Sequence, residues 1–249
     1  MSLASSTRQA GELAILTGQA FVRMFKPPYE GKLWLRQMEQ IGVKSLGVAS
    51  ITTIFTGMVL ALQTAYSLPA LGVKYYIGTV VSKSLVRELG PVLVALIVGG
   101  RIGAGMTAEI GTMKVTEQID ALRSMGADPV KKLVVPKLIA TLAMLPVLTV
   151  IGDGLGILGG LVIAQAQLDL SPGFYINDVF GSLTLQDVGS GIGKSFFFAY
   201  FITIVGCYHG LTAKGGADGV GRATTKTMVL ASILVLVSDF FLTKLFMIF

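Results

Sequence analysis

The chain has 249 residues, of which 53% are hydrophobic and 14% are charged, and its mean hydropathy is +0.74. Soluble domains carry about 25% charged residues, so this chain has too few charges to cover a soluble surface. The composition predicts an integral membrane protein. The net charge of +6 does not indicate nucleic-acid binding, because the basic residues cluster in loops between apolar runs, as membrane topology requires.

The N-terminal region, residues 1–44, is predicted to be helical and to lie in the membrane interface. Residues 10–26 place apolar side chains near helical spacing, and Pro27 with Pro28 ends that segment. Trp34 suits an anchor at the interface. A solvated cytoplasmic extension is the alternative. The apolar run is short and interrupted, which argues against a cleavable signal peptide.

Residues 45–249 are predicted to form a transmembrane domain of five helices. Each of five apolar segments can cross ~30 Å of hydrocarbon at ~1.5 Å per residue. They cover residues 45–66, 85–107, 136–164, 195–213 and 227–248. The expected fold class is therefore an all-α membrane protein.

The distribution of Lys and Arg predicts the orientation of these helices. The region through Lys44 and the loop from Arg101 to Lys137 carry six each, whereas the long loop 165–194 carries one. Cytoplasmic loops hold the excess of basic residues in membrane proteins. We therefore expect a cytoplasmic N-terminus, a cytoplasmic loop between the second and third spans, and a C-terminus on the outer side.

Glycines recur at spacings that suit close helix packing. Gly152, Gly156 and Gly160 repeat every four residues on the third span, and Gly99 and Gly103 do so on the second. Small residues allow helix backbones to approach closely in membranes. Packing within one bundle is the favoured interpretation, and a dimer seam is the alternative.

No motif predicts catalysis or a bound cofactor. "GLGILG" (154–159) lies inside an apolar span rather than in a strand-to-helix turn, and "GSGIGKS" (189–195) has Val188 where a phosphate loop needs glycine. A single cysteine, Cys207, excludes an internal disulfide and a cysteine-based metal cage. We expect Cys207 in the core and His209 at a helix end. The chain is therefore not expected to be an enzyme.

Arg87 and Glu88 are adjacent at the predicted outer end of the second span. A guanidinium matches a phosphate bidentately, so Arg87 is a candidate for binding a lipid headgroup. Glu88 would hold Arg87 in place or meet an ammonium headgroup. The alternative is an interfacial charge pair that only ends the helix.

Other charges lie at membrane depth, where ionisable groups are costly and often functional. Asp153 and Asp239 stand inside apolar spans. They would relay protons in a secondary carrier, cap a broken helix or form hydrogen bonds across the bundle. Arg101 and Glu109 are expected to pair or to reach the interface rather than to bind substrate.

The segment between the second and third spans is polar and predicts a short cytoplasmic helix. Thr116 is expected to cap it, with Glu117 and Asp120 in its first turn. Gly126 suits a left-handed stop. The apolar face would hold Val115, Ile119, Leu122 and Met125. So short a helix is marginal alone, and its acidic character favours a protein groove over lipid as its docking site.

The stretch "RELGPVLVALIVGGRIGAGMTAEIGTMKVTEQIDAL" (87–122) closely resembles the signature block of the MlaE (YrbE) permeases. These are the membrane subunits of MCE-type ABC lipid transporters. The resemblance covers nearly the whole chain from about residue 10. Further matching stretches, in the expected order, are "GMVLALQ" (57–63), "DP" (128–129), "GRATT" (221–225) and "DFFLTKL" (239–245).

The resemblance implies an N-terminal interfacial helix, five transmembrane helices and a homodimer in the bacterial inner membrane. It also implies two cytoplasmic ATPase subunits, often a STAS-domain protein, and a periplasmic hexamer of MCE-domain subunits. The cargo would be a glycerophospholipid that moves between the inner membrane and the outer envelope, which maintains outer-membrane lipid asymmetry. ATP and Mg would be used by the ATPase, and this chain would bind no cofactor.

The resemblance also implies roles for individual residues. Arg87 and Glu88 match the charged pair beside the outward-open lipid cavity. The family's coupling helix, which docks on the ATPase, matches Glu117, Gln118, Ile119, Asp120, Ala121 and Leu122. We expect lipid tails to contact Leu60, Gln63, Tyr66 and Leu71. The alternative functions are a proton-coupled carrier that uses Asp153 and Asp239, and a scaffold that only anchors an ATPase.

Overall fold

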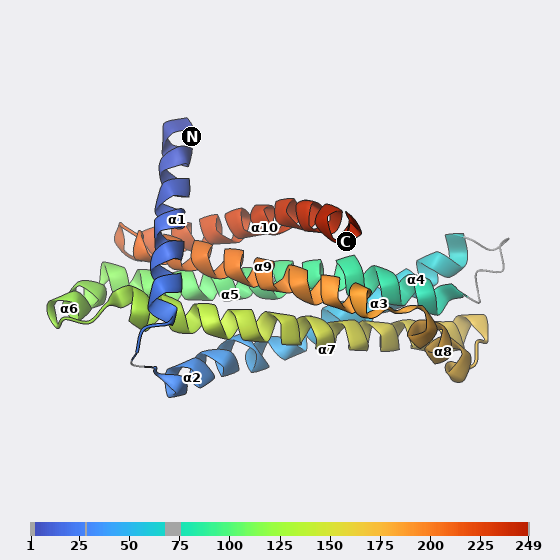
Figure 1. Ribbon diagram of the computed structural model, residues 1–249. Coiled ribbons are helices and arrows are strands. Elements are labelled where there is room, and N and C mark those ends of the chain that lie inside the picture. The colour runs from blue at the N-terminus through green and yellow to red at the C-terminus, as the bar shows by residue number, and fades with distance from the viewer. Residues whose placement is uncertain (1–2, 28, 68–75, 249) are drawn as a thin grey trace. The chain divides into compact units, whose positions relative to one another are not determined.

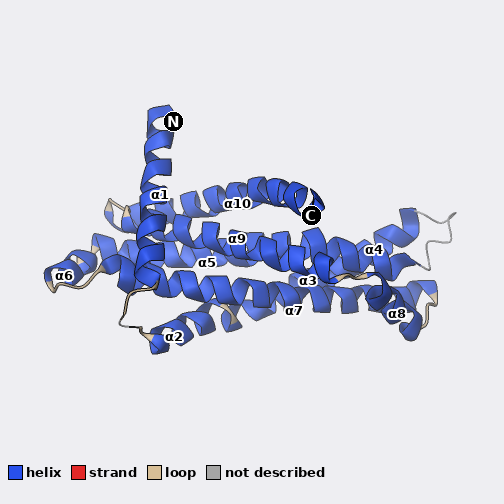
Figure 2. Ribbon diagram, viewed as in Figure 1, coloured by secondary structure: helices blue, strands red, loops and turns tan. Residues whose placement is uncertain are grey.

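A computed structural model describes residues 3–27, 29–67 and 76–248 of the chain, and nearly all of them are helical (Figure 1). None of these described residues forms a strand (Figure 2). Five helical segments among them are long and apolar enough to cross a membrane: Gly31–Tyr66, Ile77–Val115, Val130–Leu168, Leu185–Leu211 and Gly216–Phe246. The predicted all-α membrane fold with five spans is confirmed.

The helices follow one another with short connections. A 3₁₀ turn, Val43–Ser45, links α2 to α3, and single π-helical turns, Leu85–Leu89 and Val130–Val134, precede α5 and α7. The α-helices are α1 (Leu3–Met24), α2 (Gly31–Ile41), α3 (Leu46–Ser67), α4 (Ile77–Ser84), α5 (Gly90–Val115), α6 (Gln118–Ser124), α7 (Val135–Leu168), α8 (Pro172–Ser182), α9 (Leu185–Leu211) and α10 (Gly216–Ile248). α1 ends before Pro27, as predicted.

The expectation of a long loop over residues 165–194 is wrong, because α8 and the start of α9 occupy most of it. Ser171 has extended backbone and its hydroxyl accepts a hydrogen bond from the Phe174 amide at 3.3 Å. Pro172 takes the first helical position, where its missing N–H costs nothing. The dipeptide Ser-Pro before an apolar run was the sequence signal for this helix.

Two compact units can be described separately. Unit 1 comprises Met1–Val43, Gly99–Met144 and Phe198–Val235, and unit 2 comprises Lys44–Val98, Leu145–Phe197 and Leu236–Phe249. One boundary falls in the turn Val43–Ser45, and the others fall inside α5, α7, α9 and α10. The division of the chain into a segment 1–44 and a domain 45–249 stays a prediction.

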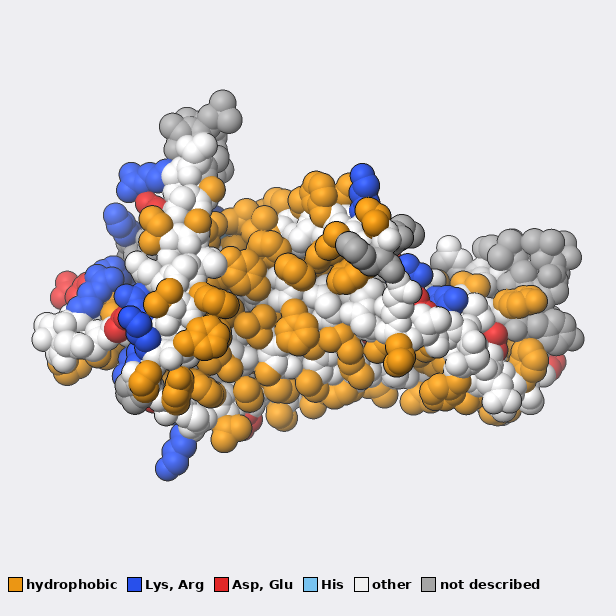
Figure 3. Space-filling model, in the orientation of Figure 1, with side chains coloured by type: hydrophobic (Ala, Val, Ile, Leu, Met, Phe, Trp, Pro, Cys, Tyr) orange, Lys and Arg blue, Asp and Glu red, His pale blue; other side chains and the backbone are white. Residues whose placement is uncertain are grey.

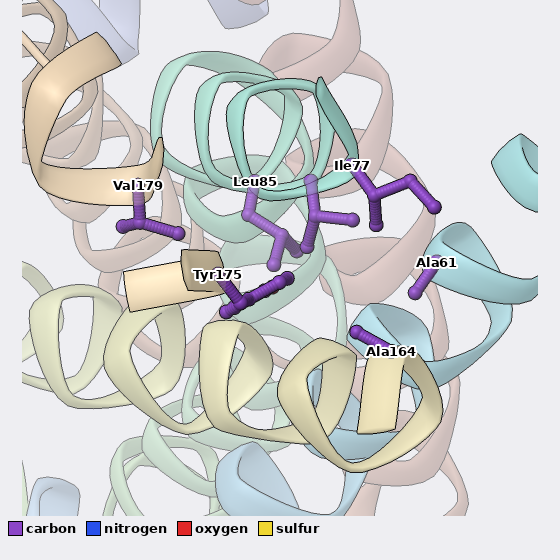
Figure 4. Close-up of a cluster of buried hydrophobic side chains, with 7 residues drawn as sticks. Ala61, Ile77, Leu85, Ala164, Tyr175 and Val179 are labelled. Carbon is purple, nitrogen blue, oxygen red and sulfur yellow. The ribbon is translucent and has the colours of Figure 1, made fainter. Parts of the chain in front are cut away.

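The core of unit 2 is a cluster of buried apolar side chains from α3, α4, the turn Leu85–Leu89, α7 and α8 (Figure 4). Its members are Ala61, Ile77, Val81, Leu85, Ala164, Tyr175 and Val179. The Tyr175 hydroxyl donates a hydrogen bond to the Ile157 carbonyl at 3.1 Å, and burial raises the pKa of this phenol. Asp178 of α8 accepts bonds from the Thr79 amide at 2.8 Å and the Thr79 hydroxyl at 2.6 Å, which secures the start of α4.

Glycines of α7 allow this close packing, as the sequence predicted for one bundle. A Cβ added at Gly156 would stand 3.0 Å from the Thr53 carbonyl oxygen, and one at Gly160 would stand 2.6 Å from the Tyr175 hydroxyl. The distance at Gly160 is shorter than real Cβ atoms show, and the distance at Gly156 is tighter than most Cβ contacts. The repeated glycines of α7 therefore serve contacts within unit 2.

Unit 1 joins α1 to the C-terminal part of α9 by hydrogen bonds between side chains. Thr17 and Tyr200 hydroxyls lie 2.8 Å apart, and the Tyr208 hydroxyl donates to the Glu12 carboxylate at 2.6 Å. The bond from Tyr208 and a second from Arg8 lower the pKa of Glu12. Cys207 is fully buried in this unit, as expected. In Figure 3, Lys and Arg side chains of unit 1 gather around α1, α2 and α6.

Candidate functional site

The π-helical turn Leu85–Leu89 of unit 2 carries both members of the predicted charged pair, Arg87 and Glu88. Pro91 follows two residues later, and proline has no N–H with which to bond the carbonyl of residue 87 in an α-helix. The Arg87 carbonyl instead accepts a hydrogen bond from Lys194 Nζ at 3.0 Å. A side chain of α9 therefore satisfies a backbone group that the turn leaves open.

Lys194 is the centre of a buried polar cluster. Its side chain is only 1% exposed, and its ammonium forms ion pairs with Glu88 and, at 3.1 Å, with Asp239 Oδ1. It also donates to the Thr243 hydroxyl at 2.7 Å. The Thr243 hydroxyl stands 3.1 Å from Glu88 Oε2. One cation thus serves two carboxylates from different helices.

Arg87 has a different partner from Glu88. Its Nη1 lies 3.3 Å from Asp187 Oδ1, and the guanidinium side chain is 35% exposed. The other Asp187 oxygen accepts bonds from the Thr184 amide at 2.9 Å and the Thr184 hydroxyl at 2.8 Å, at the start of α9. Glu88 pairs with Lys194 and therefore does not hold Arg87. Arg87 keeps part of its donor surface open to solvent or ligand.

An apolar groove of about 340 Å³ lies beside this turn in unit 2. Two predicted lipid contacts, Leu60 and Gln63 of α3, line it, and so does Leu89 of the charged turn. The other lining residues are Phe55, Thr56 and Val59. Tyr66 is 83% exposed and is not among the lining residues. Leu71 lies outside the described residues.

The two aspartates of the carrier hypothesis lie in different surroundings. Asp239 joins the Lys194 cluster. Asp153 of α7 is 8% exposed, and its Oδ1 has no hydrogen-bond partner among the described residues. That oxygen lies against Gly90, where an added Cβ would overlap it. Asp153 therefore needs a glycine at position 90.

The predicted coupling helix is present as α6, but Thr116 does not cap it. The Thr116 hydroxyl donates to the Thr112 carbonyl at 2.8 Å, which holds it on the last turn of α5. Glu117 precedes α6 with a left-handed backbone, φ 61°. α6 is short, at seven residues, as expected. The Thr116 hydroxyl bonds within the preceding helix because threonine readily donates to the carbonyl four residues earlier.

The end of α6 was predicted correctly. Gly126 has φ 75°, its amide bonds the Arg123 carbonyl at 3.0 Å, and the Ala127 amide bonds the Leu122 carbonyl at 3.0 Å. This pair of bonds is the Schellman arrangement that glycine favours. The next residue, Asp128, accepts a bond from the Val130 amide at 3.0 Å and pairs with Arg23 of α1.

The predicted coupling residues divide into one anchor and an exposed surface. Ile119 is fully buried in unit 1, whereas Met125 is 73% exposed. Leu122 is half-buried, and the exposed members of the set are Glu117, Gln118, Asp120 and Ala121. The apolar side of α6 thus faces its own unit through Ile119 and leaves Met125 uncovered.

Asp120 meets basic groups of its own chain. Lys114 Nζ donates to Asp120 Oδ2 at 2.8 Å, and Arg123 Nη1 lies 3.3 Å from Oδ1. The hydrogen bond from Lys114 lowers the pKa of Asp120. The described residues provide no ion pair for Glu117. Glu117 is therefore the acid of this segment that remains available to a partner.

Glu109, which we expected to pair with Arg101 or to reach the interface, forms an ion pair with a lysine of α7. Glu109 accepts a hydrogen bond from Lys137 Nζ at 2.6 Å, and Gln37 Oε1 lies 3.3 Å from the same nitrogen. The Lys137 side chain is 3% exposed. A lysine buried in an apolar segment requires such partners, and Glu109 and Gln37 supply them in unit 1.

Sequence reasoning missed Lys194 as a site residue and placed it at the end of an outer loop. The signal was present in "GSGIGKS", where glycines alternate before a lysine at the start of an apolar run. Gly191 lets α9 approach the Val86 carbonyl, which an added Cβ would overlap. The described residues contain no cluster of His, Cys, Asp and Glu that could hold a metal ion.

The chain is similar to a group of bacterial permeases. The family profile described as "Permease MlaE" matches residues 34–245. A probable ABC transporter permease protein of Rickettsia typhi is 44% identical over 238 residues, which cover 96% of this chain and 92% of that protein. One from Synechocystis is 43% identical over 230 residues, covering 92% and 88%.

A plant protein shows the same similarity at lower identity. Protein TRIGALACTOSYLDIACYLGLYCEROL 1, chloroplastic, of Arabidopsis thaliana is 35% identical over 232 residues. The match covers 93% of this chain and 66% of the plant protein. The family match over residues 34–245 reaches all five candidate spans and includes α6.

Proposed function

This chain belongs to the MlaE permease family, and we propose that the cargo of this permease is a glycerophospholipid. The observation that carries the proposal is the turn Leu85–Leu89. There, Leu89 lines an apolar groove, and Arg87 presents a guanidinium that is 35% exposed. Acyl chains need an apolar surface, and a headgroup phosphate needs charged donors. The name of the Arabidopsis relative includes a diacylglycerol lipid, which supports a cargo with two acyl chains on glycerol.

The tails would contact Leu60 and Gln63, with Tyr66 and Leu71 further along the same stretch. Arg87 would bind the phosphate, and Glu88 would face an ammonium group when the headgroup has one. Lys194 would keep Glu88 in place, because its ammonium contacts both Glu88 and the Arg87 carbonyl. Lipid would move between the inner membrane and the outer envelope and so maintain outer-membrane lipid asymmetry.

Membership of an ABC permease family implies association with ATPase subunits. We infer that the ATPase docks on the exposed side of α6, through Glu117, Gln118, Asp120 and Ala121, with Ile119 and Leu122 fixing the helix to its unit. ATP and Mg would be bound by the ATPase and not by this chain. The exposed position of these polar side chains supports this role.

The full assembly would contain two copies of this chain, a periplasmic hexamer of MCE-domain subunits and a STAS-domain protein. It would lie in the bacterial inner membrane, with the N-terminus in the cytoplasm and the C-terminus in the periplasm. The excess of Lys and Arg before Lys44 and between Arg101 and Lys137 supports this orientation.

The lipid proposal is tested by the phospholipid that co-purifies with the chain. We expect Arg87→Ala to lower bound phospholipid by roughly tenfold, since a hydrogen bond to a charged group contributes ~1.5–3 kcal/mol. Lipid extracted from equal amounts of protein would be quantified by mass spectrometry. Asp187→Asn is the matched control, because it removes the ion pair of Arg87 and keeps the guanidinium. Unchanged lipid in Arg87→Ala would reject this role.

The proton-carrier alternative rests on Asp153, whose buried Oδ1 has no hydrogen-bond partner in the part of the chain that the structure describes. It predicts that a proton gradient moves lipid in vesicles that contain an inactive ATPase, and that Asp153→Asn and Asp239→Asn abolish this movement. The ABC proposal predicts no movement with an inactive ATPase, whatever the gradient. Measuring transport of a fluorescent phospholipid with and without ATP separates the two.

A further inference from the structure

Unit 1 contains a separate cavity, which is polar. It lies at the turn from α9 into α10, which can be followed in Figure 1. Its volume is about 250 Å³. Three basic side chains line it, Lys214, Arg222 and Lys226, together with Gln9 of α1 and His209 of α9. No residue of the lipid-binding or coupling sets belongs to this cavity.

The three cations have no acidic partner in the described part of the chain. The ion pairs recorded there involve other Lys and Arg residues, such as Arg23, Lys132 and Lys194. Asp218 lies one turn before Arg222 on α10 but forms no ion pair with it. Three like charges that line one cavity repel each other. An anion in the cavity would offset that repulsion.

His209 lines the cavity, and its ring is held in place by a neighbouring hydroxyl. It is 8% exposed, and its Nδ1 lies 2.9 Å from the Thr227 hydroxyl oxygen. That hydroxyl also contacts the Thr107 hydroxyl at 2.7 Å and the Ala223 carbonyl at 3.0 Å. The ring is therefore held in one orientation where it lines the cavity.

The backbone at the start of α10 adds to the positive character. Gly215 and Gly216 have φ 90° and 63°, which side-chain-bearing residues rarely adopt, and they form the tight turn into α10. The first amides of a helix lack partners inside the helix and carry partial positive charge. The turn places this helix start in the same segment as Lys214 and Arg222.

We propose that this cavity binds a phosphate-bearing anion. An arginine fork matches the oxygens of a phosphate, and lysines add point charges. Basic pockets between membrane helices bind anionic headgroups in this way. The phosphate could belong to an anionic phospholipid or to a free phosphate in solution. The site is independent of the cargo proposed for the groove in unit 2.

The test is native mass spectrometry of the full chain in detergent, titrated with phosphatidylglycerol, phosphatidylcholine or inorganic phosphate. We expect Arg222→Gln with Lys226→Gln to weaken phosphatidylglycerol binding by roughly fivefold for each charge removed. Lys32→Gln with Arg36→Gln is the matched control, because both residues are exposed on α2 and outside the cavity. It should bind as the wild type does.

Arg222→Lys with Lys226→Arg preserves the charge and should retain most of the binding, which excludes misfolding as the cause of a loss. If inorganic phosphate displaces phosphatidylglycerol from the wild type, the cavity takes the free anion. If phosphatidylglycerol resists phosphate and binds above phosphatidylcholine, the cavity takes a lipid headgroup. Equal losses in the cavity variant and the α2 control, or no loss in either, would overturn the proposal.

Discussion

Lys194 shows how a single side chain organises the candidate lipid site. It is nearly inaccessible and contacts two carboxylates, a hydroxyl and a backbone carbonyl. A buried ion pair contributes little net stability compared with an apolar replacement of both partners, but loss of one partner leaves the other charge uncompensated. Removing one charge of this cluster should therefore lower the free energy of unfolding more than removing all of its charges together.

We expect Lys194→Met to lower the free energy of unfolding by about 3 kcal/mol, because Glu88 and Asp239 would lose their cation. The value lies at the low end for buried pairs, since Glu88 is 37% exposed. Thermal or denaturant unfolding of the detergent-solubilised chain measures it. Adding Glu88→Gln and Asp239→Asn to the same variant should restore most of the loss. A single variant as stable as the wild type would contradict this account.

Asp120 gives a pH-dependent prediction at the same scale. Its pKa is lowered in the folded state by the bond from Lys114, so the folded protein takes up this proton less readily than the unfolded chain. The resulting stability is complete above the unfolded pKa, ~3.9, and is lost as the pH falls through the lower folded pKa. The difference in melting temperature between the wild type and Asp120→Asn should therefore be constant near neutral pH and vanish in acid. A difference that persists in acid would refute this cause.

At the scale of elements, α9 approaches the π-helical turn Leu85–Leu89 so closely that only glycine fits. A Cβ at Gly191 would overlap the Val86 carbonyl, whereas one at Gly189 would meet no atom within 4 Å. Both glycines lie on α9, two residues apart. This approach brings Lys194 to the Arg87 carbonyl, so packing and site geometry depend on the same residue.

Gly191→Ala should destabilise the protein by ~1–3 kcal/mol, as overpacking usually does. Gly189→Ala should be neutral or stabilise by up to ~1 kcal/mol, because alanine is the better helix former. Unfolding of the two variants under identical conditions gives the comparison. Phospholipid retention should fall in the first variant only. Equal stability of the pair would show that α9 can move without cost.

Five spans and the end of α6 could be predicted from the sequence, because apolar length and the glycine at position 126 are local signals. Two errors had a common cause. Thr116 bonds to the preceding helix, and Lys194 bonds to elements distant in sequence. No local sequence pattern specifies either partner. α8 was missed for a different reason, since its Ser-Pro start was present and was overlooked.

For the whole molecule, the short segment between α5 and α7 is the proposed docking surface for a partner. Ile119 fixes α6 to unit 1, and Asp128 connects the following turn to α1 through Arg23. Glu117 remains exposed, and Asp120 is already occupied by Lys114 and Arg123. Glu117 is therefore the cleaner probe of docking.

Glu117→Lys should weaken the association with the ATPase and separate ATP hydrolysis from lipid movement, because it reverses a charge that meets the partner. We expect roughly tenfold less lipid movement per ATP, the effect of losing a charged contact worth ~1.4 kcal/mol. The measurement is transport and hydrolysis by the reconstituted complex. Glu39→Lys, an exposed reversal on α2, is the control. Unchanged coupling in Glu117→Lys would remove α6 from the docking surface.

The proline at position 91 also has a consequence for how this sequence can change over time. Because Pro91 offers no N–H, the Arg87 carbonyl depends on Lys194. A residue with an N–H at position 91 could bond the Arg87 carbonyl in place of Lys194. Position 194 would then be under less constraint. Across related sequences we therefore expect the residues at the two positions to vary together, although the positions are 103 apart along the chain.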